Sequence, residues 1–367
     1  MTHSKKIVLN VLEKIILWML IFIPISVYFS FFTDNQTMAF ISSILAILPL
    51  ATIIGYCTKE IVLQSNPTIG GLVNATFGNI IELMIAIIAL SEGLVIVVQA
   101  SIIGSILGNL LLLTGLSILF GGLKYKEQQF NKNSVGVSST MLIIAVAGLA
   151  IPTVYSLTSH ADPTEIVILG NAVAISNAIS IVLALTYIAG LSFSLFTHKH
   201  LFDSSDEIQA TKEKPTLSKK TAFIILLIAV LFVALESELL VNTIKHAVTS
   251  LGMTETFIGV ILIAILTNVA EKSTAIHFAL KNDIDTALEI GLSSAIQIAL
   301  FVVPILVFIS AIFNYGFSLV FTLFEILSML LAVMIINYLS GDGRCNWLEG
   351  VQLISLYLII AIAFYFI

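Results

Sequence analysis

Charged side chains are scarce in this chain. Only 10% of its 367 residues are Asp, Glu, Lys or Arg, whereas 58% are hydrophobic and the mean hydropathy is +1.08. A soluble domain carries about 25% charged residues and could not bury this much apolar surface. The composition therefore argues against a soluble enzyme and predicts that a lipid bilayer surrounds most of the chain. Because Lys and Arg together number only 16, nucleic acid is not expected as a partner.

Cysteine is also rare. Cys57 and Cys345 are the only two, one inside an apolar run and the other in a short loop. Two such distant thiols build neither a disulfide framework nor a zinc site. The sequence also lacks the P-loop pattern GxxxxGK[ST], so we expect a protein that uses no ATP and no cofactor.

Long apolar runs dominate what is present. A helix needs about 20 apolar residues to cross a bilayer core, and barrel strands are far shorter. Eleven such runs occur, at 7–32, 39–62, 70–90, 94–122, 134–156, 164–197, 221–247, 256–280, 285–313, 317–340 and 347–367. The prediction is an all-α polytopic membrane protein with eleven transmembrane helices.

Basic residues predict the orientation of these helices. Fourteen lysines and arginines fall in one set of connections, only Lys245 falls in the opposite set, and Lys272 lies inside a run. Positive charge collects in cytoplasmic loops. We therefore predict a multi-pass plasma-membrane protein with a cytoplasmic N-terminus and with Ile367 outside.

An internal repeat divides the chain. Residues of the third and fourth runs fall on those of the eighth and ninth at a constant offset of 189, including Gly70 on Gly259, Asn79 on Asn268, Glu82 on Glu271 and Ser105 on Ser294. The loop charges make these copies run in opposite directions. Inverted repeats of this kind build alternating-access transporters. The predicted organisation is an extra span at 1–37, a five-span repeat at 38–197, a cytoplasmic linker at 198–220 and a second five-span repeat at 221–367.

Two glutamates carry the predicted chemistry. Glu82 ends the sequence GNIIE and Glu271 ends TNVAE, each three residues after an asparagine, Asn79 or Asn268. Residues three apart share a helix face, and a carboxylate at bilayer depth marks a functional site. Two carboxylates and two amide oxygens make an all-oxygen site of the kind that suits Ca²⁺ or Mg²⁺. Glycines that precede Glu82, such as Gly78, allow local unwinding.

The same carboxylates predict proton coupling. Two close carboxylates in a low dielectric cannot both stay ionised, so protons bind when the metal is absent. A site that holds either protons or a divalent cation, and is unstable when empty, moves only when loaded. This is the logic of an antiporter.

Several motifs support a family resemblance. The stretches GLVNATFGNIIELMIAIIAL at 71–90, QASIIGSILGN from 99, SELLV at 237–241 and SSAIQIALFVVP at 293–304 resemble the calcium/proton antiporters of the cation/Ca²⁺ exchanger superfamily. The resemblance implies that Glu82 and Glu271 bind calcium or protons alternately, with Asn79 and Asn268 beside them. It also implies roles for the polar residues of the neighbouring helices, Gln99, Gln297, Ser105 and Ser294.

The second copy departs from the family pattern. Where GNxAEH is usual, this chain has a threonine at 267 and Lys272 after the glutamate. We place Lys272 on the transport path, either facing the ion or paired with an acid of another span. Glu60 and Glu238 join it as path residues, and Glu236, two residues from Glu238, cannot share that helix face.

The sequence favours Ca²⁺ export in exchange for protons and leaves alternatives open. The same fold could couple to Na⁺ or carry another divalent cation, and a cation channel or an intramembrane hydrolase are more distant readings. Ca²⁺, protons and the bilayer are the expected partners, and the sequence leaves a homo-oligomer open.

Overall fold

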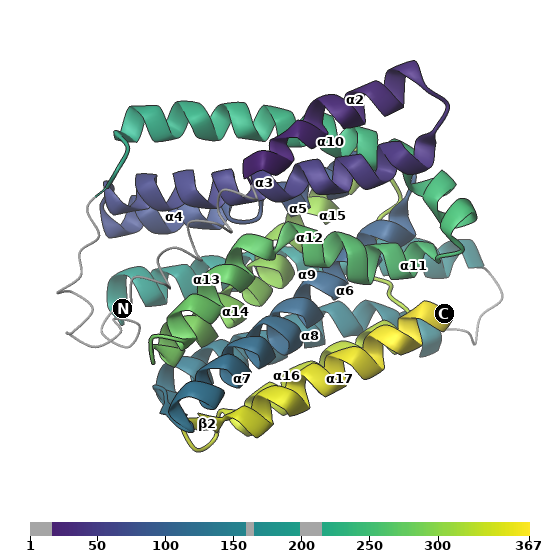
Figure 1. Cartoon of the computed structure of the whole chain (residues 1–367). Coiled ribbons are helices and arrows are strands. Elements are labelled where there is room, and N and C mark those ends of the chain that lie inside the picture. The colour runs from purple at the N-terminus through teal and green to yellow at the C-terminus, as the bar shows by residue number, and fades with distance from the viewer. Residues whose placement is uncertain (1–16, 159–164, 199–214) are drawn as a thin grey trace. The chain divides into compact units, whose positions relative to one another are not determined.

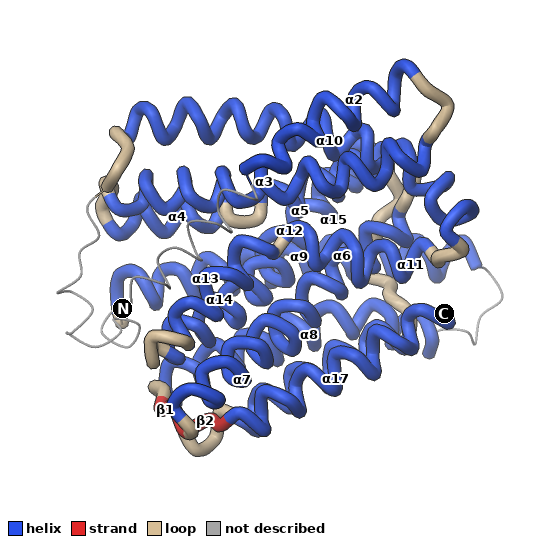
Figure 2. The backbone as a smooth tube through the Cα atoms, viewed as in Figure 1, coloured by secondary structure: helices blue, strands red, loops and turns tan. Residues whose placement is uncertain are grey.

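The computed structural model describes residues 17–158, 165–198 and 215–367. The start of the first predicted span (7–16), its flanking Lys5 and Lys6, and linker residues 199–214 lie outside these ranges. The described part is nearly all helix, and its only strands are two segments of three residues (Figure 2). The predicted helical class is therefore confirmed.

Many of these helices suit a bilayer. By length and composition, seven helices of the described part can cross a membrane, or eight if one bent pair is a single span. Shorter apolar helices cover Met19–Phe32, Ile80–Ser91 and Leu323–Leu339. Each of the eleven predicted runs contains helix, and the chain is a multi-pass membrane protein. That the runs make eleven crossings stays a prediction.

The chain forms two compact units. The first comprises Met1–Glu92 and Lys214–Glu255. Its elements are η1 (Met19–Ile21), α2 (Phe22–Phe32), α3 (Gln36–Leu63), α4 (Pro67–Phe77), α5 (Ile80–Ser91) and α10 (Lys219–Leu251). Helices α3 and α10 pack along each other, with α2 against α3 (Figure 1). Helix α10 starts where Ser218 accepts a hydrogen bond from the Thr221 amide, and it ends at Gly252, whose φ of +64° suits glycine.

The second unit comprises Gly93–Glu213 and Thr256–Ile367. Its first elements are α6 (Val95–Leu107), η2 (Gly108–Leu113), α7 (Thr114–Tyr125), β1 (Glu127–Gln129), α8 (Lys132–Thr158), α9 (Glu165–Ser192) and η3 (Phe193–Thr197). Its later elements are α11 (Glu255–Phe257), η6 (Ile258–Ile263), α12 (Ala264–Thr267), α13 (Val269–Ala279), α14 (Ile284–Gln297), η7 (Ile298–Val302), α15 (Val303–Phe313), α16 (Leu323–Leu339), β2 (Arg344–Asn346) and α17 (Trp347–Phe366). The segments η2, η3, η6 and η7 are π-helical.

Glycines let α6 and η6 cross at very short range. A Cβ added to Gly104 would lie 2.1 Å from the Val260 carbonyl oxygen, and one added to Gly259 would lie 2.6 Å from the Ala100 Cβ. Neither position can hold a side chain without separating the helices. Small residues at helix crossings are the usual means of close packing in lipid.

Three loops meet at one end of the second unit. Strand β1 pairs antiparallel with β2, so 127–129 lie beside 344–346. Between them and the end of α13, Gln128 donates through Nε2 to the Ala279 carbonyl at 3.0 Å and to Asn282 Oδ1 at 3.1 Å. All three loops belong to the set predicted to be cytoplasmic, so their meeting agrees with the predicted alternation of spans. Which side of the membrane they face stays a prediction.

The tenth predicted run, 317–340, needs a correction. Helix α16 begins only at Leu323, capped by Thr322, and residues 317–322 are not helical. Side chains from elsewhere bond the backbone of this buried segment: Thr153 accepts from the Phe321 amide at 2.8 Å, and Ser176 accepts from the Leu319 amide at 3.1 Å. Irregular backbone at membrane depth is tolerated where protein groups satisfy it in this way.

Candidate ion-binding site

In the first unit, the helix that carries Glu82 is broken. Helix α4 ends at Phe77, Gly78 and Asn79 form a turn, and α5 starts at Ile80. Asn79 is buried and has φ −113° and ψ 19°, outside the helical region. Gly78 is required here, since a Cβ would lie 2.5 Å from the Asn74 carbonyl oxygen. Glu82 therefore stands in the first turn of α5, where the helix dipole favours a negative charge.

The second unit repeats this arrangement at Glu271. Helix α12 ends at Thr267, Asn268 has φ −105° and ψ 22°, and α13 starts at Val269. The two helical stretches on either side are bent by 61°. Glu271 stands in the first turn of α13. The sequence predicted a single continuous span over 256–280, so this bend was missed.

The two breaks correspond residue by residue. Each follows an asparagine, and the two asparagines are separated by the offset of 189 found in the sequence. Glu82 and Glu271 are both half-buried, and each has one carboxyl oxygen shielded from solvent. Membrane transporters commonly bind ions where a helix is interrupted in this way, because the unwound backbone exposes carbonyl oxygens.

A buried polar network surrounds the second break. Asn109 donates through Nδ2 to Ser294 Oγ at 2.8 Å and to Asn268 Oδ1 at 3.3 Å. Asn268 in turn donates to Ser105 Oγ at 3.3 Å and to the Ala264 carbonyl at 3.1 Å. The structure thus brings together three residues predicted for the site, Asn268, Ser105 and Ser294. Asn109, the last residue of the QASIIGSILGN stretch, is the residue that joins them.

Two π-helical segments flank this network. Segment η2 covers Gly108–Leu113 and contains Asn109, while η7 covers Ile298–Val302 directly after Gln297. Adding 189 to positions 109–113 gives 298–302, so the two segments occupy equivalent places in the repeat. Such bulges inside helices frequently mark functional sites. The hydrophobic pattern of the sequence gives no signal for them.

Lys272 points back along its own broken span. Its side chain is 8% exposed, and its ammonium group donates to the carbonyls of Ala264 and Ile265, both at 3.4 Å. These carbonyls end the helix on the other side of the break, where a cation is favourable. From the sequence we expected an acid of another span as the partner, so these backbone carbonyl acceptors were missed.

The two predicted glutamines differ in what they contact. Gln99, half-buried on α6, donates through Nε2 to the carbonyls of Ser318 at 3.2 Å and Val320 at 2.8 Å. It therefore supports the non-helical segment 317–322. Gln297 is half-buried at the last position of α14.

The other predicted path acids are placed very differently. Glu238 is exposed on α10, whereas its neighbour Glu236 is fully buried. Glu60, 4% exposed near the end of α3, accepts hydrogen bonds from the amides of Thr216 at 2.9 Å and Leu217 at 3.0 Å. The hydrogen bonds of Glu60 therefore fix the segment directly before α10.

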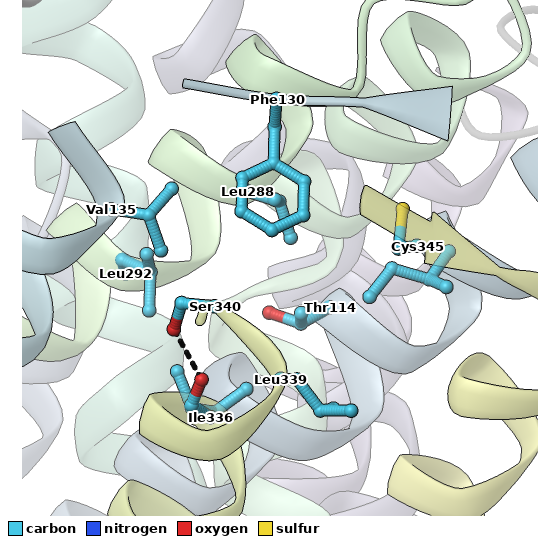
Figure 3. A pocket seen from close by; sticks show the side chains of 10 residues that line it. Thr114, Phe130, Val135, Leu288, Leu292, Ile336, Leu339, Ser340 and Cys345 are labelled. Carbon is cyan, nitrogen blue, oxygen red and sulfur yellow. Dashed lines mark hydrogen bonds between the residues drawn. The ribbon is translucent and has the colours of Figure 1, made fainter. Parts of the chain in front are cut away.

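A separate small cavity in the second unit is apolar. Figure 3 shows Phe130, Leu288 and Leu292 around it, with Thr114 and Ser340 as its polar neighbours. Its volume is about 20 Å³, and no acidic side chain lines it, so it does not suit a cation. Cys345, at its edge, is buried, and burial raises the pKa of this thiol to about 12. Such a thiol is a poor metal ligand and a poor nucleophile.

Among the described residues, no group of three or more His, Cys, Asp or Glu could hold a metal ion. The candidate oxygen ligands are instead one carboxylate and one asparagine at each break. A site of this composition relies on amide and backbone oxygens as well as carboxylates, which suits hard cations.

Comparison with known proteins gives a consistent result. The family described as sodium/calcium exchanger protein matches residues 35–196 and 221–366. The chain is 40% identical over 370 residues to a Ca²⁺/H⁺ antiporter of Synechocystis, covering 96% of this chain and 98% of the relative. It is 42% identical over 347 residues to the Ca²⁺/H⁺ antiporter ChaA of Bacillus subtilis, covering 94% and 96%.

Solved structures agree with the sequence relatives. Native YfkE superposes with a TM-score of 0.80 at 39% identity, covering 94% of this chain and 97% of that one. The H⁺/Ca²⁺ exchanger CAX superposes with a TM-score of 0.69 at 14% identity, covering 96% and 92%. The second similarity shows a shared fold.

Proposed function

Because this chain belongs to the sodium/calcium exchanger protein family, we propose that it is a Ca²⁺/H⁺ antiporter that exports Ca²⁺ in exchange for protons. Relatives described as Ca²⁺/H⁺ antiporters match it at 40–42% identity over nearly their full lengths. One observation carries the assignment to residues: each repeat has a glutamate in the first helical turn after a break at an asparagine.

In this proposal, Glu82 and Glu271 supply the two charges that a divalent cation needs. Asn79 and Asn268 add side-chain oxygens, and the unwound backbone at each break offers carbonyls. Gln99, Gln297, Ser105 and Ser294 line the proton and cation path, and Glu60, Glu238 and Lys272 lie along it. The support is the shared chemistry of these groups, all hard oxygens apart from the lysine.

Protons and Ca²⁺ compete for the same carboxyl oxygens. When Ca²⁺ leaves, the carboxylates are neutralised by protons, because two bare charges at bilayer depth are unstable. The site then moves in either loaded form, and the proton gradient drives Ca²⁺ uphill. No cofactor and no enzymatic step are needed.

The wider arrangement belongs to the proposal as well. Eleven spans comprise the extra helix at 1–37 and two inverted five-span repeats, 38–197 and 221–367, joined by the linker at 198–220. Alternating access between these repeats exposes the site to each side in turn. The N-terminus is cytoplasmic, the C-terminus is outside, and the membrane is the plasma membrane. The charge asymmetry of the loops supports this orientation.

The test is ⁴⁵Ca²⁺ uptake into inverted membrane vesicles that contain the protein. An acid-inside pH gradient should drive uptake, and a protonophore should abolish it. A Na⁺ gradient of the same size should drive none. Uptake that follows the Na⁺ gradient would establish the Na⁺-coupled alternative, and uptake that ignores both gradients would indicate a channel.

A further inference from the structure

The first unit contains a buried carboxyl on a helix that carries neither Glu82 nor Glu271. Glu236 is in the middle of α10, which covers Lys219–Leu251, and its side chain is 0% exposed. The proposed exchange mechanism makes no use of it. Burying an ionised carboxylate in apolar surroundings is very costly unless a cation or several hydrogen bonds compensate it.

The contacts of Glu236 are hydroxyl groups. Its Oε1 lies 2.7 Å from Ser26 Oγ on α2. Ser43 on α3 lies near the carboxyl, but its hydroxyl makes no hydrogen bond within the described part of the chain. Both serines are 0% exposed. Oε2 is shielded from solvent and makes no hydrogen bond within the described part of the chain. The polar contact therefore joins α2 to α10, and α3 places a third buried hydroxyl beside it.

The position of the Ser26 hydroxyl shows which group donates in each of its two hydrogen bonds. Ser26 Oγ lies 2.7 Å from Glu236 Oε1 and also 2.7 Å from the carbonyl oxygen of Ile23. Both distances are those of a normal O–H···O hydrogen bond. A serine hydroxyl has one proton, and a carbonyl oxygen can only accept. The serine proton therefore goes to Ile23, and the other contact needs a proton from the carboxyl.

We infer that Glu236 is a second proton-binding carboxyl, separate from Glu82 and Glu271, which holds its proton as a neutral acid and donates it to Ser26. The resulting hydrogen bond between Glu236 and Ser26 links α10 to α2, the helix that precedes the first repeat. Ca²⁺ binding at the helix breaks leaves this proton in place, because the acid has no cation ligand role. No bond other than the hydrogen bond is made or broken.

The helices packed against this carboxyl place few charges near it. On α2 the titratable residue is Tyr28, which is exposed. On α3 they are Tyr56, Cys57, Lys59 and Glu60, at least 13 positions beyond Ser43 and so about 20 Å along the helix. Helix α10 carries the exposed Glu238 two residues away, and α5 carries Glu82 and Glu92. None of these groups contributes a charge interaction to Glu236.

The test is infrared difference spectroscopy of the full-length protein, reconstituted in lipid at neutral pH and saturated with Ca²⁺. Saturating Ca²⁺ ionises the carboxyls that it binds, so a remaining C=O band of protonated carboxyl reports other acids. We expect Glu236→Gln to remove such a band. Glu92→Gln, the matched change at an exposed glutamate of the same unit, should leave it.

Ser26→Ala gives an independent readout, which also serves if Glu236→Gln does not fold. This variant removes the acceptor of the carboxyl proton but not the proton, so the band should shift and persist. A spectrum in which neither variant alters a protonated-carboxyl band would overturn the inference, because Glu236 would then be ionised. The band is measured without transport, so this result is independent of whether the protein exchanges Ca²⁺ for protons.

Discussion

The side chain of Asn109 donates a hydrogen bond to Asn268, with 3.3 Å between Nδ2 and Oδ1. Asn109 is fully buried in the π-helical segment η2, and Asn268 is the residue at which the second-repeat helix breaks. A residue from the first half of the sequence therefore stabilises the helix break that precedes Glu271. Because the same amide also bonds Ser294, Asn109 connects the parts of the second unit's polar network.

Replacing Asn109 should destabilise this network. Asn109→Leu removes both donors and leaves two buried acceptors unbonded, which costs about 1–3 kcal/mol for each group. We expect a lower thermal midpoint in detergent and weaker Ca²⁺ binding. Asn242→Leu, on the exposed face of α10, is the control and should change neither. An Asn109→Leu protein with normal Ca²⁺ affinity would show that the network does not support the site.

The paired carboxylates give the most direct prediction. Glu82→Gln and Glu271→Gln should each abolish Ca²⁺/H⁺ exchange, because a divalent cation then faces only one negative charge. Expression and thermal stability should stay near normal, since glutamine keeps the shape of the side chain. Glu92→Gln, at the exposed end of the same helix as Glu82, is the control for transport. Near-normal exchange in either site variant would refute the assignment.

Calcium affinity should depend on pH in one direction. Metal ions bind deprotonated ligands, so acidification must weaken Ca²⁺ binding to the purified protein. Each proton displaced by Ca²⁺ lowers the apparent affinity by up to about tenfold for each unit that the pH falls. Isothermal titration from mildly alkaline to mildly acid pH measures this slope. A binding constant that does not change over this range would argue for a channel or for coupling to Na⁺.

The crossing of α6 and η6 should tolerate no side chain. Gly104→Val would push α6 away from the Val260 backbone, and overpacking of this kind costs about 1–3 kcal/mol or more. We expect a clear fall in the thermal midpoint and in the yield of folded protein. Gly136 is the control: it lies within α8 with no atom within 4 Å of an added Cβ, so Gly136→Ala should be tolerated.

Lys272 should matter for stability more than for calcium affinity. Its ammonium group bonds the carbonyls of Ala264 and Ile265, so Lys272→Met removes donors that hold the two sides of the break together. We expect a loss of about 1–3 kcal/mol in stability with unchanged Ca²⁺ affinity. Calcium titrations of Lys272→Met and Lys272→His decide between the two roles. A clear gain of affinity in Lys272→His would mean that the lysine repels the bound cation.

Sequence patterns predicted the helices and the carboxylate motifs because both depend on neighbouring residues. Apolar run length is enough to indicate a membrane helix, and the offset between the motifs at Asn79 and Asn268 is visible without coordinates. The bend at Asn268 was not predicted, because the length and apolar content of the run 256–280 do not show where its hydrogen-bond ladder breaks.

Long-range contacts explain the other differences. Residues 317–322 are apolar enough for part of a span, but their backbone is held out of helical conformation by hydrogen bonds to other helices. Thr153 and Ser176 accept from its amides, and Gln99 donates to its carbonyls. Similarly, spacing shows that Glu236 and Glu238 lie on different faces of α10. Only the packing of α2 and α3 shows which of the two is buried.

Glu60 also bears on how the chain tolerates changes of length. Its carboxyl accepts hydrogen bonds from the backbone amides of Thr216 and Leu217. These bonds fix the position at which α10 begins. Residues added or removed before Thr216 then leave the start of that helix where it is. The linker can therefore accept an inserted tag or fluorescent reporter, whereas an insertion between Thr216 and Lys219 would rotate α10 and turn Glu236 away from Ser26.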